Sequence, residues 1–313
     1  MIEPSLVAQP VINPSGGNFT SSQTVSLSTS TAGAAIYYTI DGSTPSASAQ
    51  QYTGPFTLTS SKTVNAVAFV SGVGQSDVST ATFVILNGGE AINFSSGFEG
   101  AQGLTFNGSA ASLNDGSLKL TDTVGTQEHG SVFFNTPVDI RQFQTSFTFQ
   151  LSSAAADGFT FTIQSNAPTA LGPSGGGLGY GPDTTTGKAG IPNSVAIKFD
   201  LYNNQGEGVN STGLYTAGAS PTTPAIDLTS SGINLHSGDP ILATLSYNGT
   251  TLMLALTDQT TNRTFTQSFT VNIPSIVNAT SAYVGFTGGT GGNTALQKIL
   301  NWTFTQTPDE AIR

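Results

Sequence analysis

The sequence predicts an all-β protein, and three observations support this fold class. The chain contains 37 Gly and 15 Pro but only 8 Lys and Arg among its 313 residues. Its hydrophobic residues alternate with polar ones in short runs, which is the period of a β-strand. No segment combines helical periodicity with capping residues, so we expect little helix. A chain of this length can form two hydrophobic cores, and we expect two domains.

Composition and charge restrict the class of partner. With 18 Asp and Glu against 8 Lys and Arg, the formal net charge is −10, which disfavours nucleic acid and leaves calcium and neutral glycans as compatible partners. No apolar run is long enough to cross a bilayer and no export signal begins the chain, so we expect a soluble, mature chain without membrane insertion. The absence of cysteine excludes disulfides. This composition fits a secreted, extracellular or cell-surface bacterial product.

The first domain is predicted at residues 9–86, after an N-terminal extension at 1–8. Its alternating runs and the turns between them are typical of a small Ig-like β-sandwich. The predicted strands are 24–28, 35–40, 64–70 and 81–85, and the predicted turns are 14–17, 41–45 and 72–74.

The motifs of this domain point to a known module. YYTIDGSTP at 37–45, YTGP at 52–55 and TVNAVA at 63–68 together resemble the chitobiase/β-hexosaminidase C-terminal domain. The resemblance covers nearly all of residues 9–86. It implies a β-sandwich accessory module, often a spacer beside glycan-active domains, and not a catalytic domain.

The second domain is predicted at residues 91–306, between a polar, Gly-rich linker at 87–90 and a C-terminal tail at 307–313. Its short strands recur along the whole segment, which favours a jelly-roll β-sandwich because stacked sheets hide their edges. The predicted strands are 91–94, 118–120, 144–151, 159–163, 195–199, 242–247, 251–256, 282–286 and 299–304.

One segment of this domain changes from an apolar strand to a loop of oxygen donors. It reads VAIKFDLYNNQGEG over residues 195–208. Asp200, Asn204, Glu207 and the carbonyl of Tyr202 could converge on a hard cation, and calcium prefers such oxygen ligands. The spacing alone leaves two readings open, a calcium site and a solvated Gly-rich hairpin.

Four segments in order resemble the legume (L-type) lectins: ADGFTFTI at 156–163, GGGLG at 175–179, the 195–208 loop, and 284–293 with the last strand at 299–304. The resemblance implies a concanavalin-like jelly roll that holds Ca²⁺ through Asp200, Tyr202, Asn204 and Glu207. It also implies a carbohydrate site. The residues expected there are Asp157, a backbone N–H near Gly176 or Gly177, Asn204, the Tyr202 ring, and the loop at Gly292 and Asn293.

The sequence departs from the lectin pattern at a second, transition-metal site. Where that family has a Glu and a His ligand, this chain has Lys198 and Ser211. A charged lysine donates hydrogen bonds and does not ligate a metal. We therefore expect no transition-metal site, and an ammonium at Lys198 that neutralises carboxylate charge. The calcium loop is also one residue shorter than the family's, so Glu207 would replace the usual Asp.

The sequence thus predicts a secreted, calcium-dependent carbohydrate-binding protein with an accessory spacer module. Glycans are the expected partners, and a homo-oligomer is a candidate assembly because open sugar sites bind weakly. The first alternative is a structural or adhesive surface protein with a degenerate lectin fold. An enzyme is a weaker alternative, since Asp157 and Asp200 lie on separate loops and neither His129 nor His236 has a serine or cysteine motif near it.

Overall fold

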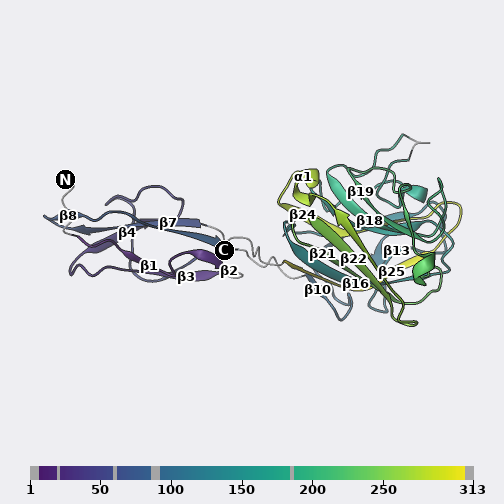
Figure 1. Ribbon diagram of the computed structural model, residues 1–313, viewed down its shortest axis with the longest axis horizontal. Coiled ribbons are helices and arrows are strands. Elements are labelled where there is room, and N and C mark those ends of the chain that lie inside the picture. Colours follow the sequence, from purple (N-terminus) through teal and green to yellow (C-terminus); the bar gives the residue numbers. More distant parts are fainter. Residues whose placement is uncertain (1–6, 20–21, 59–61, 86–91, 184–186, 307–313) are drawn as a thin grey trace. The chain divides into compact units, whose positions relative to one another are not determined.

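The computed structural model describes residues 7–19, 22–58, 62–85, 92–183 and 187–306 (Figure 1). These residues fall into two compact units, one within 7–85 and the other within 92–306. Strands account for nearly all regular structure in both units, which confirms the all-β prediction. The predicted linker at 87–90, the tail at 307–313 and most of the extension at 1–8 lie outside the described residues.

The first unit is a β-sandwich, as predicted. Its described strands form a three-stranded sheet, β1-β3-β6, and a six-stranded sheet, β2-β9-β7-β4-β5, in which β8 also pairs with β7. Val25, Val64 and Phe83 have no exposed surface and pack in the core between the sheets. The strands are β1 Val11–Asn13, β2 Gly17–Phe19, β3 Gln23–Ser28, β4 Ala35–Thr39, β5 Gln50–Gln51, β6 Phe56–Leu58, β7 Lys62–Val70, β8 Gly74–Gln75 and β9 Ser79–Ile85.

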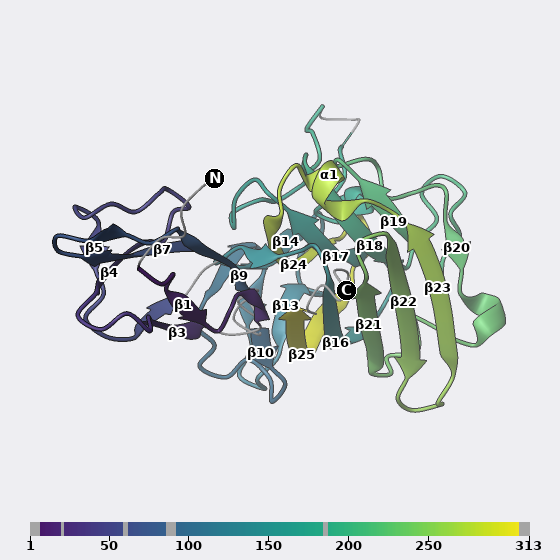
Figure 2. The same cartoon turned by 60° about the vertical axis from the view of Figure 1, so that its left-hand side comes forward.

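The second unit is the predicted jelly-roll sandwich. Its described strands form one eight-stranded sheet in the order β12-β13-β25-β16-β21-β22-β23, in which β10 also pairs with β25 (Figure 2). That sheet comprises β10 Ile92–Phe94, β12 Ala111–Ser112, β13 Leu118–Thr121, β16 Phe143–Ser152, β21 Ile241–Tyr247, β22 Thr251–Asp258, β23 Thr264–Thr270 and β25 Leu296–Gln306.

The facing sheet of this unit also has eight strands among the described residues, in the order β11-β14-β24-β17-β18-β19-β20 with β15 on β24. Its strands are β11 Leu104–Gly108, β14 His129–Phe134, β15 Val138–Asp139, β17 Gly158–Gln164, β18 Ser194–Asp200, β19 Ser211–Thr216, β20 Ile226–Asp227 and β24 Ser281–Gly289. We call it the site sheet, because the predicted site residues lie at one end of its strands.

Aromatic side chains join the two sheets of this unit. Phe147 of β16 stacks on Phe161 of β17, with ring centroids 5.6 Å apart, and meets Phe286 of β24 edge to face at 4.9 Å. Trp302 of β25 is fully buried against Phe286. Each such pair adds about 0.5–1.5 kcal/mol beyond simple area burial, so this core fixes the strand ends firmly in place.

Helix is scarce, as the sequence predicts. The α-helix of the described residues, α1 (Ile273–Val277), begins at Asn272, whose side chain accepts a hydrogen bond from the Ser275 N–H. In the described part of the chain no helix has both the length and the apolar character needed to cross a membrane.

Candidate functional site

Three strand ends of the site sheet bring distant segments of the sequence together. Gly158 of β17 pairs with Asp200 of β18 on one side and with Gly289 of β24 on the other. The Asp157 N–H donates to the Gly289 carbonyl at 3.2 Å, and the Leu201 N–H donates to the Asp157 carbonyl at 2.8 Å. Asp157 therefore lies between the loop that follows β18 and the loop that follows β24.

The carboxyl group of Asp157 is buried and only partly satisfied. The residue is 3% exposed, and its peptide bond with Ala156 is cis. Asn204 Nδ2 lies 3.5 Å from Oδ1, whereas Oδ2 has no hydrogen-bond partner among the described residues. Burial raises the pKa of Asp157 to about 6, against the effects of Asn204 and the Gly291 backbone, and the charge of Glu207 raises it further. The carboxyl group can therefore accept hydrogen bonds from a ligand.

Asp200, at the end of the neighbouring strand, has partners for both carboxylate oxygens. Oδ2 lies 2.8 Å from the ammonium of Lys198, which has no exposed surface, and Oδ1 accepts the Tyr202 N–H at 3.1 Å. The same ammonium donates to the Thr222 carbonyl at 2.9 Å and lies 5.5 Å from the centre of the Tyr215 ring. Burial raises the pKa of Asp200 to about 6 despite the opposing charge of Lys198. The predicted neutralisation of a carboxylate by Lys198 is thus present.

Lys198 and Ser211 do not provide a site for a second metal ion. Ser211 pairs with Asp200 across β18 and β19, and its hydroxyl is buried without a hydrogen-bond partner among the described residues. A lone hydroxyl and an ion-paired ammonium are not the nitrogen and carboxylate ligands that a transition metal requires. The side chains at these positions therefore do not fit a transition-metal ion.

The loop after β18 is held by its own side chains. Glu207 is 5% exposed, and its Oε1 accepts the Asn204 N–H at 2.9 Å while its Oε2 accepts the Gln205 N–H at 2.5 Å. Asn203 Oδ1 accepts the Gly206 N–H at 2.7 Å. The Glu207 side chain thus folds back onto its own loop and closes it.

Buried charge at this end of the sheet is unbalanced. The carboxylates of Asp157, Asp200 and Glu207 are all buried, and in the described structure Lys198 forms an ion pair with Asp200. The charge of Glu207 adds to the effect of burial in raising the pKa of both aspartates. A buried charge without compensation is costly, so this arrangement favours an additional divalent cation.

The donor set suits calcium better than other metals. Within the described residues, no group of three or more His, Cys, Asp or Glu side chains is placed to hold a metal ion. The oxygens of Asp200 and Glu207 would instead act with the Asn204 amide and the Tyr202 carbonyl, a mixed set of the kind that calcium accepts. Each carboxylate oxygen retains a lone pair beyond the hydrogen bond that it already accepts. These residues therefore fit calcium.

Two glycines allow the loops of the site to approach one another. A Cβ atom at Gly176 would lie 2.7 Å from Cγ of Asn204, and a Cβ atom at Gly291 would lie 3.0 Å from Oδ2 of Asp157. Gly176 belongs to a short 3₁₀ segment, Gly175–Gly177, that is tied to the loop after β24 by the Gly175 N–H to Thr290 carbonyl hydrogen bond. The structure thus brings together Asp157, Gly176 and Asn204 of the predicted sugar site.

The remaining predicted residues lie around this centre. Tyr202 is 40% exposed, so part of its ring is available to a ligand. Gly177 is buried within the 3₁₀ segment. Gly292 and Asn293 are exposed on the loop after β24, and no hydrogen bond in the described structure joins either of them to Asp157 or Asn204. The sequence did not indicate Gly291. A Cβ atom at Gly291 would lie 3.0 Å from Oδ2 of Asp157, whereas nothing lies within 4 Å of a Cβ atom at Gly292.

His236 is a second residue that sequence reasoning missed. Its ring nitrogens lie 2.6 Å from the carbonyl oxygens of Ala154 and Val209, which belong to the loops that carry Asp157 and Glu207. The imidazole therefore links the two loops of the candidate site. No local motif surrounds His236, because both contacts are made with residues distant in the sequence.

Comparison with known families assigns both units. Residues 91–313 match the legume lectin domain, and residues 14–80 match the chitobiase/beta-hexosaminidase C-terminal domain.

The two relatives described next are plant proteins. The chain is 27% identical over 223 residues to the L-type lectin-domain containing receptor kinase I.7 of Arabidopsis thaliana, a match that covers 65% of this chain and 33% of that protein. It is 31% identical over 215 residues to Agglutinin-2 of Cladrastis kentukea, covering 60% of this chain and 69% of the agglutinin. The chain thus spans about a third of the length of the receptor kinase.

Solved structures show the same fold. The lectin from Bauhinia forficata in complex with GalNAc superposes with a TM-score of 0.59 at 24% identity, over 71% of this chain and all of that one. The winged bean acidic lectin complexed with methyl-alpha-D-galactose gives a TM-score of 0.60 at 22% identity, over 71% of this chain and 99% of that one. With a legume lectin domain match over residues 91–313, the chain belongs to the legume lectin family.

Proposed function

We propose that the second unit binds carbohydrate where Asp157, Asn204 and Gly176 meet, with one calcium ion as cofactor. The observation that carries this proposal is Oδ2 of Asp157, a buried carboxylate oxygen that lacks a partner in the described structure beside the exposed amide of Asn204. Membership of the legume lectin family supports the same assignment.

A sugar presents pairs of hydroxyl groups and apolar C–H faces, and the residues of this site match both. Asp157 would accept hydrogen bonds from hydroxyl groups, and Asn204 Nδ2 would donate one. A backbone N–H at Gly176 or Gly177 would add a second donor. The exposed part of the Tyr202 ring would pack against the C–H face, and the loop at Gly292 and Asn293 would form the rim.

The proposed cofactor would be held by oxygens of Asp200, Glu207, Asn204 and Tyr202, and when bound it would neutralise the surplus carboxylate charge. The protein itself contributes to the order of the loop through the Lys198–Asp200 ion pair and the hydrogen bonds that Glu207 accepts. A single bound cation should therefore be sufficient, and a transition metal should not be required.

We further propose that the chain acts outside the cell, with the first unit as an accessory spacer and residues 87–90 as the linker. A bacterial source stays a prediction, since the relatives named above are plant proteins. Limited proteolysis should release the second unit as a stable fragment. Recovery of only small peptides from both units would contradict the proposed boundary.

The proposed activity is binding without catalysis. In this proposal Asp157 accepts hydrogen bonds from sugar hydroxyl groups and Asp200 binds the cation, so neither carboxylate is assigned to catalysis. The receptor kinase named above is about three times as long as its matched region, so its name carries no activity over to this chain. A structural or adhesive role without sugar binding is the second candidate, and the replacement of metal ligands by Lys198 and Ser211 favours it.

A glycan array with and without calcium tests these proposals together. We expect binding of neutral glycans that is lost after chelation, and a melting temperature that falls on chelation. A cation that binds only the folded state at a hundred times its Kd adds about 2.7 kcal/mol of stability. Glycan binding that survives chelation would remove calcium from the proposal, and an array without any signal would favour the structural role.

A further inference from the structure

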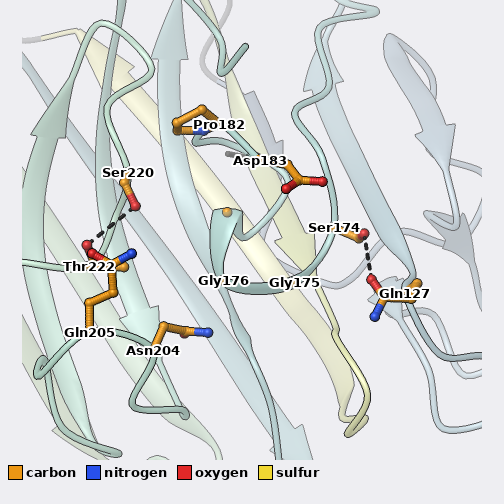
Figure 3. Close-up of a pocket in the computed structure, with 11 residues that line it drawn as sticks. Gln127, Ser174, Gly175, Gly176, Pro182, Asp183, Asn204, Gln205, Ser220 and Thr222 are labelled. Atoms are coloured by element: carbon orange, nitrogen blue, oxygen red, sulfur yellow. Dashed lines mark hydrogen bonds between the residues drawn. The ribbon is translucent and has the colours of Figure 1, made fainter. Parts of the chain in front are cut away.

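The first unit contains a hollow that the proposed function does not use. Its volume is about 600 Å³, within the range of about 300–1,000 Å³ that is typical of pockets for small ligands. We call it the Tyr37 hollow, because that side chain lines it. The pocket beside Asn204 in the second unit belongs to the proposed sugar site and differs in kind. Figure 3 shows hydroxyl and amide side chains there, including Gln205, Ser220 and Thr222, and no described residue of its lining is aromatic.

The Tyr37 hollow lies on the outer face of the six-stranded sheet. Ala66 and Ala68 of β7 belong to the core of the first unit. Side chains alternate along a strand, so Val67 and Phe69 point to the other face of the sheet. Tyr37 of β4 lies opposite Val67 in the antiparallel pair, and Val67 has no exposed surface. The outer face therefore has a packed base beside Tyr37.

Two aromatic rings form a corner in the Tyr37 hollow. The ring centroids of Tyr37 and Phe69 lie 5.5 Å apart, and the two ring planes are inclined at 88°. This edge-to-face contact fixes one ring relative to the other. Both side chains are half-buried, so part of each ring is open to a ligand. A ligand with a flat apolar face can stack on one ring while its edge contacts the other.

Glycines border the Tyr37 hollow on two turns. Gly33 lies in the turn before β4, and Gly72 and Gly74 lie where β7 turns into β8. All three have positive φ, and no atom lies within 4 Å of a Cβ atom at any of them. The space beside their peptide groups is therefore open, and Ser71 adds a hydroxyl group on the second turn. The hollow thus combines apolar rings with hydrogen-bonding groups.

The lining of the Tyr37 hollow selects a neutral ligand with both apolar and hydroxyl groups. None of the described residues that line it is charged, although the chain has a formal net charge of −10. A charged ligand would lose water here without gaining a counter-charge. A purely apolar ligand would cover the Tyr37 and Ser71 hydroxyl groups without bonding to them. A sugar unit satisfies both requirements, since its C–H face packs on a ring and its hydroxyl groups form hydrogen bonds.

The size of the Tyr37 hollow disfavours a protein partner. Ten residues line it, whereas a stable protein interface involves about 20–30 residues on each side. The ligand that fits is therefore a small molecule or one segment of a polymer.

We propose that the first unit has a carbohydrate site of its own, in which a segment of a neutral polysaccharide stacks on Tyr37 and Phe69. This inference goes beyond the spacer role proposed for the first unit, and it does not depend on sugar binding at Asp157. A polysaccharide with repeated units then has a site on each unit of the chain, and linked sites raise the overall affinity for such a polymer.

Electrophoresis in native gels that contain neutral polysaccharides tests this proposal. All chains carry Asp157→Ala, which removes the proposed site of the second unit. At least one of soluble glucans, mannans, galactans and xylans should retard this chain relative to a gel without polysaccharide. Adding Tyr37→Ala or Ala47→Glu should weaken the binding about tenfold. Ala47 lines the hollow from an exposed position, so its replacement does not disturb the core.

The matched control is Thr57→Glu in the same background. It adds the same charge at an exposed position of β6, on the other sheet of the first unit, and should be retarded as the background chain is. The melting temperature of each variant shows whether it is folded.

The outcomes separate this inference from the proposed function. A folded Asp157→Ala chain that none of these polysaccharides retards would overturn the proposal. Retardation that both Tyr37→Ala and Ala47→Glu leave unchanged would also overturn it. Stronger retardation by an acidic polysaccharide than by any neutral one would overturn the ligand class. Sugar binding at Asp157 is measured separately, by the glycan array with the parent chain, so either proposal can fail while the other stands.

Discussion

Asp157 and Asp200 are neighbours at the end of one sheet, yet their surroundings differ. Both are buried, and burial raises the pKa of each to about 6. Asp200 has a protein partner for each oxygen, the Lys198 ammonium and the Tyr202 N–H, whereas Asp157 Oδ2 has none among the described residues. The comparison indicates that Asp200 organises the loop and that Asp157 is left for a ligand.

Removal of the Lys198 ammonium should cause the largest change in the free energy of unfolding. Lys198→Met leaves the carboxylate of Asp200 buried without its partner, which costs about 3–5 kcal/mol of unfolding free energy. The matched control is Lys298→Met, because Lys298 pairs with Asp115 at 2.6 Å on the surface and such pairs contribute about 0–1 kcal/mol. Equal losses of stability in the two variants, measured by denaturant unfolding, would show that the buried Lys198–Asp200 pair contributes no more stability than the Lys298–Asp115 pair.

Neutralisation of Asp157 should stabilise the calcium-free protein. The pKa of Asp157 is raised from 3.8 to about 6, so its ionisation opposes folding as the pH rises between these values, and the penalty is complete above about 6. With chelator at pH 7, Asp157→Asn should raise the unfolding free energy by about 3 kcal/mol, and at pH 4 the gain should fall to about 0.5 kcal/mol.

Asp115 provides a control of opposite sign for this pH dependence. Hydrogen bonds from Lys298 and Ser117 hold the pKa of Asp115 well below its ordinary value. Its charge therefore favours folding above its ordinary pKa, so Asp115→Asn should reduce stability at pH 7 and have less effect in acid. A destabilising effect of Asp157→Asn at pH 7 in chelator would mean that Asp157 has a stabilising partner that the structure does not show.

A smaller effect is expected at Gly176, where the two loops approach. A Cβ atom there would lie 2.7 Å from Asn204 Cγ, and the Asn204 side chain can move aside because it is exposed. Gly176→Ala should therefore change stability by less than about 1 kcal/mol and weaken sugar binding about tenfold through the displaced amide. Gly54→Ala in the first unit is a suitable control, because nothing lies within 4 Å of a Cβ atom at that position and its φ is not in the left-handed region. Unchanged sugar affinity in Gly176→Ala would remove Asn204 from the sugar site.

The sequence was sufficient to predict the two sandwiches and most long strands, because a buried sheet face imposes strict alternation, as in 144–151 and 251–256. It did not indicate two-residue strands such as β5 and β12, which are too short to show a period. The roles of Asp157, Asn204 and Gly176 in the sugar site follow from the resemblance to lectin motifs, whereas Asn204 as a cation ligand also follows from the spacing of oxygen donors in residues 195–208.

The contacts that distinguish this site are non-local, which is why the sequence did not reveal them. The predicted neutralising role of Lys198 depends on the partner Asp200 on the same strand, and this could be inferred. Its second partner, the Thr222 carbonyl, lies on a loop without a recognisable motif. The same holds for His236 and for Ser220 on the wall of the pocket, whose positions depend on how loops pack over the sheet.

The most direct test of the central claim compares sugar binding by the parent chain and by Asp157→Ala in saturating calcium, with Lys298→Met, which removes the ion pair with Asp115, as the control. Calorimetry with the preferred glycan should show millimolar binding, about −4 kcal/mol, by the parent and by Lys298→Met. Asp157→Ala should lose about 1.5–3 kcal/mol, which places its affinity beyond detection, while its melting temperature shows that it is folded. Binding of the same glycan by folded Asp157→Ala with the affinity of the parent would contradict the assignment of Asp157 as the ligand-binding carboxylate.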